Sequence, residues 1–479
     1  MRLGQAFAGR MLAGRLLGLQ KVHAHNTRAI PPRLVRTLAS SPSLPTTGER
    51  HRVLILGGGT AGVGTAAQLK NAGVEDICIV EPSDVHYYQP GWTFVGAGIF
   101  DIEATKRTTA SVIPEGVRWI QAPAAAILPE DNKVTLAGGE NIGFDYLIVA
   151  TGVRCDWEKI PGLTEALEKG PESGVCSNYH PKYAPNTWAT VQRLSSGGER
   201  GNAIFTQPAG AVKCGGAPQK IMWMTEDHLR KKGKRENFDI HFALPLPAPR
   251  MFGVNEYNPV LNAEADARGV KRYHQTVLVS VDAEKKEATF REIGGEKEGT
   301  EITMPFAMLH VTPPMSVPEV LKESTLLNES GFVDVDKATL QHKKYPNVFA
   351  LGDSADASAL PTSKTMAAVA AMAPVVTHNL QRVMQGKQPS AEYDGYSSCP
   401  IPLSYDRLLL TEFIFGPKPQ ETFTGKLFFP DQGEPSKFYF WVKQHLFPYV
   451  YWTLFPRGKW FGRQLLTPFD FSEADAKKA

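Results

Sequence analysis

Apolar and polar positions along the first part of the chain change period in the order expected for a strand, a helix and a second strand. Four consecutive apolar residues, Val53 to Leu56, form a short run that a Gly-rich turn follows. Small residues from near Thr60 to Asn71–Gly73 then predict a helix, and the apolar run Ile77 to Val80 predicts the next strand. The stretch Arg52–Glu81 is therefore predicted to form a β-α-β unit of an α/β fold.

Three glycines in this turn have the spacing of a dinucleotide-binding loop. Gly57, Gly59 and Gly62 form G-x-G-x-x-G between the strand and the helix. The first glycine allows a tight turn, the second lets the backbone approach a pyrophosphate, and the third packs the helix against the strand. The phosphates would lie on the helix N-terminus, where amides and the helix dipole favour negative charge. Glu81, at the end of the second strand, is placed to hydrogen-bond a ribose hydroxyl, so we expect a dinucleotide site here rather than an ordinary Gly-rich turn.

The segments after Glu81 are predicted to complete this first domain. The aromatic and Gly-rich stretch His86–Gly98 is too irregular for a regular element, and it either wraps a flat ring system or forms a packed loop. Short alternating runs in Val117–Leu136 predict a small antiparallel meander. Phe144–Gly152 reads as a buried apolar strand that ends in Thr-Gly, so the first domain is expected to pause near Gly152.

A second strand-loop-helix-strand unit begins at Gly201, with the first strand NAIFTQP, the helix IMWMTEDHLRKKG and the second strand FDIHFALP. A nicotinamide cofactor would need G-x-G-x-x-G in its loop, but the chain has Pro208, Gly210 and Cys214 instead. No acidic residue follows the second strand. The nucleotide-binding fold is therefore predicted to be duplicated without an NAD(P)H site. Cys214 is interpreted as either a reactive thiol or a small core residue.

Two later segments are predicted to return to the first domain. Strand-like runs occupy Val270–Thr303, and Ala307–Pro314 leads back. The short apolar run Tyr345–Asp353 ends in Gly352 and Asp353, which is the position of the second FAD signature in flavoproteins with two dinucleotide folds. In such proteins the acid holds the ribityl or pyrophosphate region, and we expect this of Asp353.

An Ala-rich helix is predicted over Thr362–Met384, with a hydroxyl N-cap and a kink at Pro374. Its N-terminus would face the flavin ring and stabilise negative charge on the reduced ring, and Lys364 would add a cation. A plain amphipathic core helix is the alternative.

The C-terminal region contains an aromatic and basic segment. Eleven of the 24 residues from Phe438 to Phe461 are aromatic, and Lys443, His445, Arg457 and Lys459 are interleaved with them. This pattern is too polar to span a bilayer, but it suits a helix pair that lies in the membrane interface. A dimer interface is the alternative.

The first 48 residues differ in composition from the remainder. They hold seven Lys or Arg and no Asp or Glu, and Arg10 and Arg15 interrupt their apolar residues. Such a segment is typical of a mitochondrial presequence, because a secretory signal would have an unbroken apolar core; a disordered basic tail is the alternative. The whole chain has a net charge of only +3, so the remainder is net acidic. No strongly basic nucleic-acid surface is therefore expected.

Five cysteines are too few and too scattered for a disulfide scaffold, and none forms C-x-x-C, so no structural zinc site is expected. Cys78 lies inside the strand ICIV and should be buried and inert. No uninterrupted apolar run is long enough to span a bilayer.

Several motifs together resemble the mitochondrial sulfide:quinone oxidoreductase family, over about Arg52 to Gly462. They are GGGTAG at 57–62, YQPGWTFVGAG at 88–98, NAIFTQP with VKCGGAPQKIM at 202–222, MLHVTPPMS at 308–316, LPTSKT at 360–365 and YDGYSSCP at 393–400. The two cysteine motifs are specific to that family.

The resemblance implies a flavoenzyme of the disulfide-reductase-like class. Cys214 and Cys399 match the family's redox pair, which forms a disulfide or sulfur-bridged trisulfide beside FAD. Sulfide attacks this bridge and leaves a persulfide on one cysteine and a thiolate on the other, with Lys213 or Lys220 available to lower a thiol pKa. The sulfane sulfur leaves on a small acceptor, glutathione or sulfite, and ubiquinone takes the electrons. The cofactor-binding residues implied are Gly57, Gly59, Gly62, Glu81, Gly152, Gly352, Asp353 and Lys364.

Cys176 matches the approximate position of a third cysteine in bacterial relatives, so it is interpreted as either an accessory sulfur-transfer thiol or a surface thiol. Cys155 is assigned no role. The protein is expected on the matrix side of the inner mitochondrial membrane, bound peripherally, and a homodimer is possible.

The predicted fold class is α/β, with two tandem Rossmann-like domains and a C-terminal amphipathic, membrane-associating region. The predicted domains are a presequence (1–48), a discontinuous FAD domain (49–152 and 315–395), a second Rossmann-like domain (153–314) and a quinone and membrane region (396–479). Two other functions share this fold. An NADH:quinone oxidoreductase should carry a second G-x-G-x-x-G and would not need Cys214 or Cys399. A non-catalytic flavin-binding interaction protein would show no reaction with sulfide.

Overall fold

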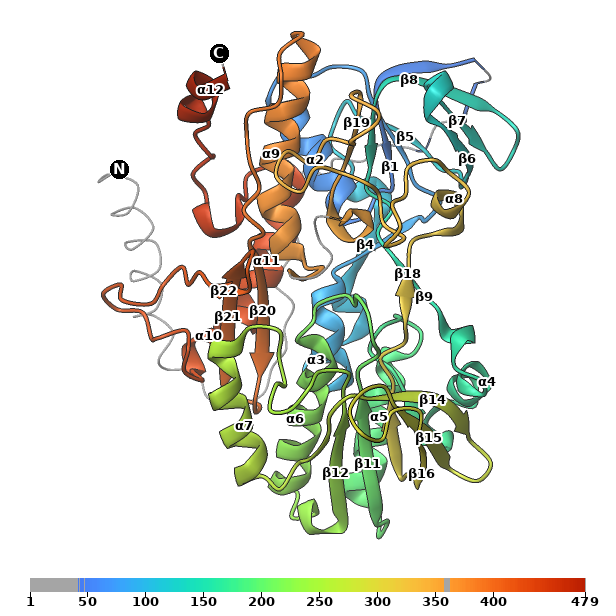
Figure 1. Ribbon diagram of the computed structural model, residues 1–479, viewed down its shortest axis with the longest axis vertical. Helices are drawn as coiled ribbons and strands as arrows, with labels where there is room; N and C mark the ends of the chain where they lie inside the picture. The colour runs from blue at the N-terminus through green and yellow to red at the C-terminus, as the bar shows by residue number, and fades with distance from the viewer. Residues whose placement is uncertain (1–41, 43, 47, 357–361, 479) are drawn as a thin grey trace.

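Two lobes, each built on a largely parallel sheet, are stacked along the long axis of the molecule (Figure 1). The structure, a computed structural model, describes residues 42, 44–46, 48–356 and 362–478. The predicted presequence therefore lies outside the described residues except for its last few positions. Two short antiparallel strands, β9 (Arg154–Cys155) and β18 (Met315–Ser316), join the lobes where the chain leaves the upper lobe and returns to it.

The upper sheet has seven strands in the order β5-β2-β1-β8-β7-β6, and β19 also pairs with β8. Its strands are β1 (Arg50–Leu56), β2 (Ile77–Val80), β5 (Arg118–Ile120), β6 (Ala124–Leu128), β7 (Lys133–Leu136), β8 (Asn141–Val149) and β19 (Val348–Ala350). β1, β2, β5, β8 and β19 pair in parallel, and β6 and β7 add antiparallel strands.

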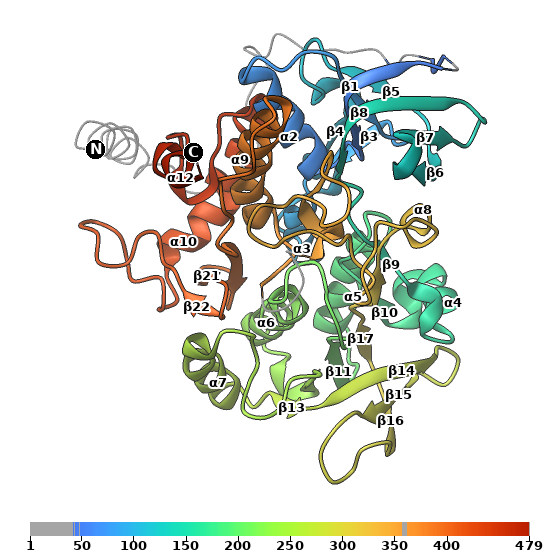
Figure 2. The same ribbon diagram turned by 45° about the horizontal axis from the view of Figure 1, so that its top comes forward.

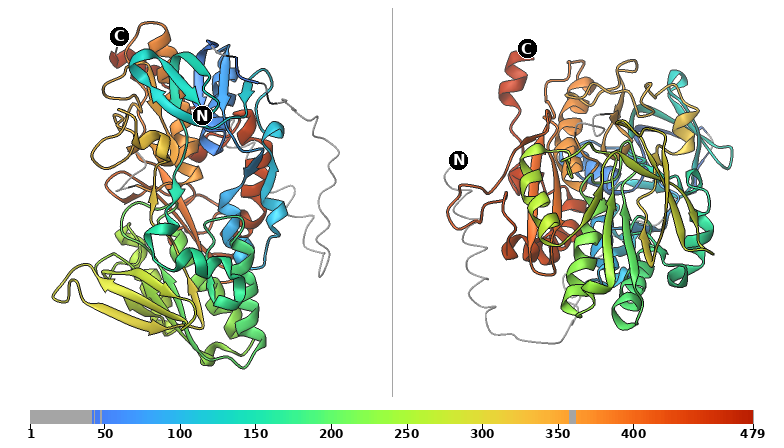
Figure 3. Two further views of the ribbon diagram at one scale, coloured as in Figure 1. Left: turned by 90° about the vertical axis from the view of Figure 1, so that its right-hand side faces the viewer. Right: turned by 60° about the horizontal axis from the view of Figure 1, so that its bottom comes forward.

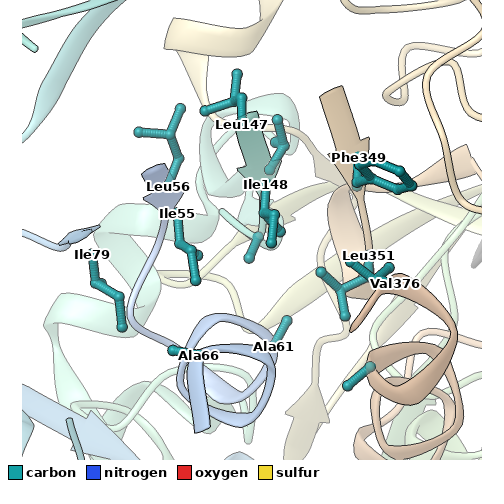
Figure 4. Close-up of a cluster of buried hydrophobic side chains, with 14 of the residues drawn as sticks. Ile55, Leu56, Ala61, Ala66, Ile79, Leu147, Ile148, Phe349, Leu351 and Val376 are labelled. Carbon is teal, nitrogen blue, oxygen red and sulfur yellow. The ribbon is translucent and has the colours of Figure 1, made fainter. Parts of the chain in front are cut away.

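Helices α2 (Thr60–Asn71) and α9 (Met366–Met384) lie side by side against this sheet (Figures 1 and 4). Ile55 and Ile148 on the sheet face the small residues Ala61 and Ala66 of α2, all of them buried. Small side chains on the helix let it approach the strands closely. Burying one large aliphatic side chain in this way contributes about 1.5–3 kcal/mol to stability.

The β-α-β unit predicted over Arg52–Glu81 is present with the expected boundaries, and the Ala-rich helix is also confirmed. The Thr365 hydroxyl caps α9 by accepting a hydrogen bond from the N–H of Ala368 at 3.1 Å, and Pro374 lies inside the helix.

In the upper lobe one local prediction was wrong and another was confirmed only in part. The stretch His86–Gly98 is not irregular throughout, because it contains the end of β3 (Val85–Tyr87, paired with β4, Lys106–Thr108) and the short helix α3 (Trp92–Gly96). The meander consists of β6, β7 and β8, whereas β5 pairs in parallel with β2. The two buried residues of β5, Trp119 and Ile120, pack into the main hydrophobic core.

The lower lobe contains the duplicated unit. Its five-stranded parallel sheet has the order β10-β17-β11-β12-β13, with β10 (Val175–Cys176), β17 (Met308–His310), β11 (Gly201–Thr206), β12 (Phe238–Ala243) and β13 (Lys271–Tyr273). Helix α3 of the first domain packs against α5 (Ala184–Ser196) and α6 (Ala217–Lys231), and it lies between the lobes (Figure 2). An antiparallel sheet of β14 (Thr276–Asp282), β15 (Glu287–Glu292) and β16 (Glu301–Pro305) forms one edge of this lobe (Figure 3).

The C-terminal part packs beside both lobes rather than apart from them. It holds the antiparallel strands β20 (Ser397–Pro402), β21 (Leu408–Ile414) and β22 (Lys418–Pro419) and the helices α10 (Lys437–Trp441), α11 (Phe447–Thr453) and α12 (Ser472–Lys478). The remaining helices are α4 (Leu163–Glu168), α7 (Asn258–Ala267) and α8 (Glu319–Lys322).

The expected interfacial helix pair is instead one helical segment, because a π-helical turn at Val442–Leu446 joins α10 to α11 without a break. Several of its aromatic residues are buried; Tyr439 is 1% exposed and Tyr451 is fully buried. Much of the apolar surface of this segment therefore packs against the protein core and is not available to a membrane.

Candidate active site

The glycines of the first turn divide into two that the fold needs and one that it does not. A Cβ on Gly62 would lie 1.8 Å from the carbonyl oxygen of Gly57, and a Cβ on Gly57 would lie 2.5 Å from that of Ala150. Gly57 also has a φ of +100°, which disfavours other residues. A Cβ on Gly59 would meet no atom within 4 Å. The open side of the turn is therefore at Gly59, which precedes the first residue of α2, as a pyrophosphate-binding turn requires.

Glu81 is held in place by the same turn. Its Oε2 accepts a hydrogen bond from the N–H of Gly58 at 2.8 Å, and its Oε1 accepts one from the N–H of Ser83 at 2.8 Å. The carboxylate is thus fixed at the end of β2 and keeps further lone pairs for a ribose hydroxyl.

The second predicted signature lies against the first. Gly352 has a φ of +72°, and a Cβ there would lie 3.0 Å from the Cβ of Ala61 in α2. Lys364 is buried; its Nζ donates to the carbonyl oxygen of Asp353 at 2.6 Å and lies 3.8 Å from the ring centre of Phe332. Burial lowers the pKa of Lys364 to about 8, although Asp353 opposes this shift.

The predicted cofactor residues thus gather at the carboxyl ends of the parallel strands β1, β2, β8 and β19, and they fit a flavin dinucleotide. The turn at Gly59 and the N-terminus of α2 offer amides for the pyrophosphate, and the Glu81 carboxylate is oriented for a ribose. Gly152 also has a positive φ, +68°, and a Cβ there would meet nothing within 4 Å.

The structure brings Cys214 and Cys399 together across 185 residues of sequence. Their Sγ atoms lie 3.3 Å apart. Cys214 lies in the loop between β11 and α6, with a left-handed φ of +56°, and its N–H donates to the carbonyl oxygen of Lys364 at 2.7 Å. Cys399 lies fully buried on β20, which packs against α6. A non-glycine residue with positive φ is uncommon, and such backbone strain is concentrated at functional sites.

The two thiols are electrostatically unlike. Lys220, one turn into α6, donates from Nζ to the Sγ of Cys214 at 3.1 Å. The hydrogen bond with Cys399, the charge of Lys220 and the N–H of Gly216 hold the pKa of Cys214 well below its ordinary value, against the effect of burial. Burial and the neighbouring Cys214 raise the pKa of Cys399 well above its ordinary value. Cys214 is therefore the thiolate of the pair.

A second buried lysine, Lys443, lies near the pair, although its aromatic surroundings predict a position at the membrane interface. Lys443 was expected at the membrane interface, but it is only 3% exposed, donates from Nζ to the carbonyl oxygen of Pro90 at 3.1 Å, and lies 5.3 Å from the ring centre of Phe94. Burial and the charge of Lys220 lower its pKa to about 7, while the cysteine sulfurs oppose the shift. The sequence held one indication of this burial: Lys443 is surrounded by aromatic residues in the stretch from Phe438 to Phe461.

Comparison with known proteins gives the family. The pyridine nucleotide-disulphide oxidoreductase family matches residues 51–193. The mitochondrial sulfide:quinone oxidoreductase of Mus musculus is 42% identical over 419 residues, which cover 87% of this chain and 89% of that protein. The corresponding protein of Schizosaccharomyces pombe is 39% identical and covers 88% and 93%. The chain belongs to the mitochondrial sulfide:quinone oxidoreductase family.

The fold agrees with a solved structure as well. The sulfide:quinone oxidoreductase of Aquifex aeolicus superposes with a TM-score of 0.70 at 19% identity, covering 86% of this chain and 92% of that one. These comparisons confirm three sequence predictions: the resemblance to this family, the α/β fold with two dinucleotide-binding units, and FAD as the cofactor. Among the described residues no helix is long and apolar enough to cross a membrane.

Of the other three cysteines of this sulfide:quinone oxidoreductase family member, two are fully buried and one is partly buried. Cys176 is not a surface thiol, because it is fully buried on β10 and burial raises its pKa to about 12. Cys78 is fully buried in β2, as predicted. Cys155 is partly buried on β9, and its Sγ lies 3.7 Å from the carbonyl oxygen of Tyr179.

The C-terminal segment is hydrogen-bonded to the dinucleotide turn, which sequence reasoning missed. The Tyr451 hydroxyl lies 2.8 Å from that of Thr60 and 2.7 Å from Nε2 of His86. Burial lowers the pKa of His86 to about 4, so the ring is neutral, and its Nδ1 donates to the carbonyl oxygen of Gly58 at 3.0 Å. Nε2 then accepts from Tyr451. The segment that contains Tyr451 thereby contacts the loop at the N-terminus of α2 directly.

Proposed function

We propose that this protein oxidises sulfide at the Cys214–Cys399 pair and delivers two electrons through FAD to ubiquinone. The single observation that carries the proposal is the pair itself. The two sulfur atoms lie 3.3 Å apart, and that of Cys214 accepts a hydrogen bond from Lys220. Curated relatives of high identity are named sulfide:quinone oxidoreductases, which supports the same reaction here.

The unequal pKa values give the chemical step a direction. With the pair oxidised to a disulfide, hydrosulfide attacks the sulfur of Cys399, the Cys214–Cys399 bond breaks, and Cys214 leaves as a thiolate. Cys399 then carries a persulfide, with the proton of hydrosulfide on its outer sulfur. A thiol of low pKa is the better leaving group, and Lys220 stabilises the charge that forms on Cys214.

The second step moves the sulfane sulfur to a small acceptor, glutathione or sulfite. With sulfite, the outer sulfur of the Cys399 persulfide is transferred, thiosulfate leaves, and Cys399 keeps the proton as a thiol. Re-formation of the Cys214–Cys399 bond releases two electrons and the proton of the Cys399 thiol, and FAD, when bound, would supply the acceptor that links these electrons to the quinone. Gly59, Glu81, Gly352, Asp353 and Lys364 would hold FAD beside the pair. In domain terms, 49–152 with 315–395 would hold FAD, 153–314 would carry Cys214, and 396–479 would serve the quinone.

Quinone dissolved in lipid requires a surface that meets a membrane. We place the protein in mitochondria, peripherally on the matrix side of the inner membrane, as its mitochondrial relatives and its basic N-terminal segment favour. Two large apolar side chains in the loop before α10 are strongly exposed: Leu427 by 78% and Phe428 by 90%. Tyr449 of α11 is 54% exposed. Apolar groups at such exposure are typical of contact with lipid or with a partner.

The test is steady-state reduction of a soluble ubiquinone by FAD-loaded protein, with sulfide plus sulfite or with NADH as the donor. We expect sulfide-dependent reduction that Cys214→Ser and Cys399→Ser abolish, and no reduction by NADH, since the loop after β11 lacks the second glycine motif. Reduction by NADH alone would favour an NADH:quinone oxidoreductase. No reduction by either donor would favour a non-catalytic flavin-binding protein.

A further inference from the structure

Ser363 contacts both halves of the redox centre. It belongs to the loop that leads into α9 and is only 8% exposed. Its Oγ accepts a hydrogen bond at 3.1 Å from the N–H of Gly215, the residue after Cys214, and lies 3.7 Å from the Sγ of Cys399. A Cβ on Gly215 would lie 3.0 Å from this oxygen, so the glycine keeps the approach open. One hydroxyl therefore touches the Cys399 sulfur and the backbone that carries Cys214.

Bonds to two other segments hold this serine in place. The N–H of Cys214 donates to the carbonyl oxygen of Lys364, the next residue in the loop, at 2.7 Å. On β20, the Ser397 hydroxyl donates to the carbonyl oxygen of Ser363 at 3.2 Å and lies 2.8 Å from the hydroxyl oxygen of Thr365. Because the loop is bonded to the strand on one side and to the cysteine loop on the other, the Ser363 hydroxyl is held against the centre.

The hydroxyl can serve the Cys399 sulfur in either protonation state, because a serine oxygen both donates and accepts. With Cys399 as a thiol, its S–H donates to the Ser363 oxygen. With that proton absent, the hydroxyl can turn its own proton to the sulfur. Cys399 is fully buried; burial and Cys214 raise its pKa well above the ordinary value, and Lys220 and the N–H of Gly216 oppose this only in part. Negative charge on this sulfur is therefore costly, and a further donor stabilises it.

Charge reaches the Cys399 sulfur in the second step of the proposed reaction. In the first step Cys214 is the leaving group, and Lys220 is its partner. In the second step the acceptor attacks the outer sulfur of the persulfide, the sulfur–sulfur bond breaks, and its electron pair goes to Cys399. The proton of the outer sulfur then moves to Cys399, which ends as a thiol. A thiol of raised pKa is a poor leaving group, so this step gains most from a hydrogen-bond donor.

We propose that the Ser363 hydroxyl donates a hydrogen bond to the Cys399 sulfur as the persulfide bond breaks, and so speeds transfer of the sulfane sulfur to the acceptor. This assignment rests on the proposed function for the identity of the step. The two cysteines thus have different partners. An ammonium group stabilises Cys214 as a lasting thiolate, whereas a neutral hydroxyl leaves Cys399 free to take up a proton.

The test compares Ser363→Ala with Ser397→Ala in FAD-loaded protein. Ser397 is fully buried and its hydroxyl bonds the same loop, so its loss measures loosening of that loop. Anaerobic addition of sulfide, followed by quenching and mass spectrometry, gives the rate at which the Cys399 persulfide forms. Removal of excess sulfide and addition of sulfite then give the rate of persulfide decay and of thiosulfate release.

Ser363→Ala should slow the decay of the persulfide about tenfold and leave its formation within about twofold of the wild-type rate, because only the second step places charge on Cys399. Ser397→Ala should lower the melting temperature and leave both rates near those of the wild type. Equal decay rates in Ser363→Ala and wild type, or equal slowing of formation and decay, would overturn the proposal. So would the same slowing of decay in Ser397→Ala.

A second measurement does not depend on sulfide. In a Cys214→Ala background, the rate at which methyl methanethiosulfonate labels Cys399, measured against pH, reports the thiolate fraction of Cys399. Adding Ser363→Ala should move this profile to higher pH and slow labelling at pH 8 about fivefold. If the wild type forms no Cys399 persulfide with sulfide, the proposed function fails, and the labelling profile still decides whether Ser363 stabilises charge on Cys399. An unchanged profile would contradict that role.

Discussion

Lys220 Nζ lies 3.1 Å from Sγ of Cys214, whereas the ammonium of Lys213, although adjacent in sequence to Cys214, turns to the side chain of Gln89 at 3.1 Å. A side chain one turn into α6 points back along the helix toward its N-terminus, where Cys214 lies. Of the two lysines that the sequence offered as the source of the field on the thiolate, the structure selects Lys220.

The first prediction concerns this ion pair. In Lys220→Gln the pKa of Cys214 should rise, so its thiolate should form only at higher pH. Alkylation of the reduced protein by iodoacetamide at pH 7 should slow about tenfold, and the pH profile of the alkylation rate should move to higher pH. Lys213→Gln is the matched control and should leave the profile in place. Equal profiles for all three proteins would show that Lys220 does not set the pKa.

The second prediction concerns the dinucleotide turn. Gly59→Ala should fold normally, because a Cβ there meets nothing within 4 Å, but it should lose FAD, since the methyl group occupies the side from which a pyrophosphate approaches. Gly198→Ala is the control, an exposed position that is equally free of neighbours. The ratio of flavin absorbance to protein absorbance, with the melting temperature, reports the result. Full FAD content in Gly59→Ala would contradict the site.

The third prediction concerns Tyr451, which joins the C-terminal segment to the turn through Thr60 and His86. Tyr451→Phe removes both hydrogen bonds and leaves Nε2 of His86 buried without a partner, so the free energy of unfolding should fall by about 1–3 kcal/mol. Denaturant unfolding at fixed FAD concentration measures it. Tyr449→Phe, at a 54% exposed position, should change stability by less than about 0.5 kcal/mol.

The fourth prediction concerns the membrane. Replacing Leu427 and Phe428 together by Ser should release the protein from liposomes that contain anionic lipid, with flavin content unchanged. Ile293→Ser, a partly exposed apolar position in the lower lobe, should not. This is a cleaner test than truncation after Ser436, because truncation would also remove buried residues such as Tyr439 and Tyr451. Retained liposome binding with a change in oligomeric state would instead identify a contact between two copies.

Most of the fold could be predicted from sequence patterns within short stretches of the chain. The β-α-β unit of Arg52–Glu81, the duplicated unit after Gly201 and helix α9 each follow from periodicity, glycine spacing and a capping hydroxyl within about 30 residues. Helix α3 escaped this reasoning because Trp92–Gly96 is short and aromatic, and its helical state depends on packing against α5 and α6.

The centre itself is a product of tertiary structure. Periodicity and spacing cannot pair Cys214 with Cys399, and only the family's motifs suggested it. Burial of Lys443, the hydrogen bonds of Tyr451 and the full burial of Cys176 all depend on contacts between segments that are distant in sequence. In each of these cases the neighbouring residues in the sequence do not reveal which distant segment packs over the side chain, so they cannot predict its burial or its hydrogen bonds.

The most direct test of the account is an anaerobic titration of the FAD-loaded protein with sulfide, followed at the flavin absorbance band, for wild type and for Cys214→Ser. We predict that the band of the wild type bleaches on addition of sulfide and returns on addition of a soluble ubiquinone, and that Cys214→Ser shows neither change. Bleaching of the variant to the same extent as the wild type, or a wild type that responds to NADH and not to sulfide, would contradict a reaction centred on Cys214 and Cys399.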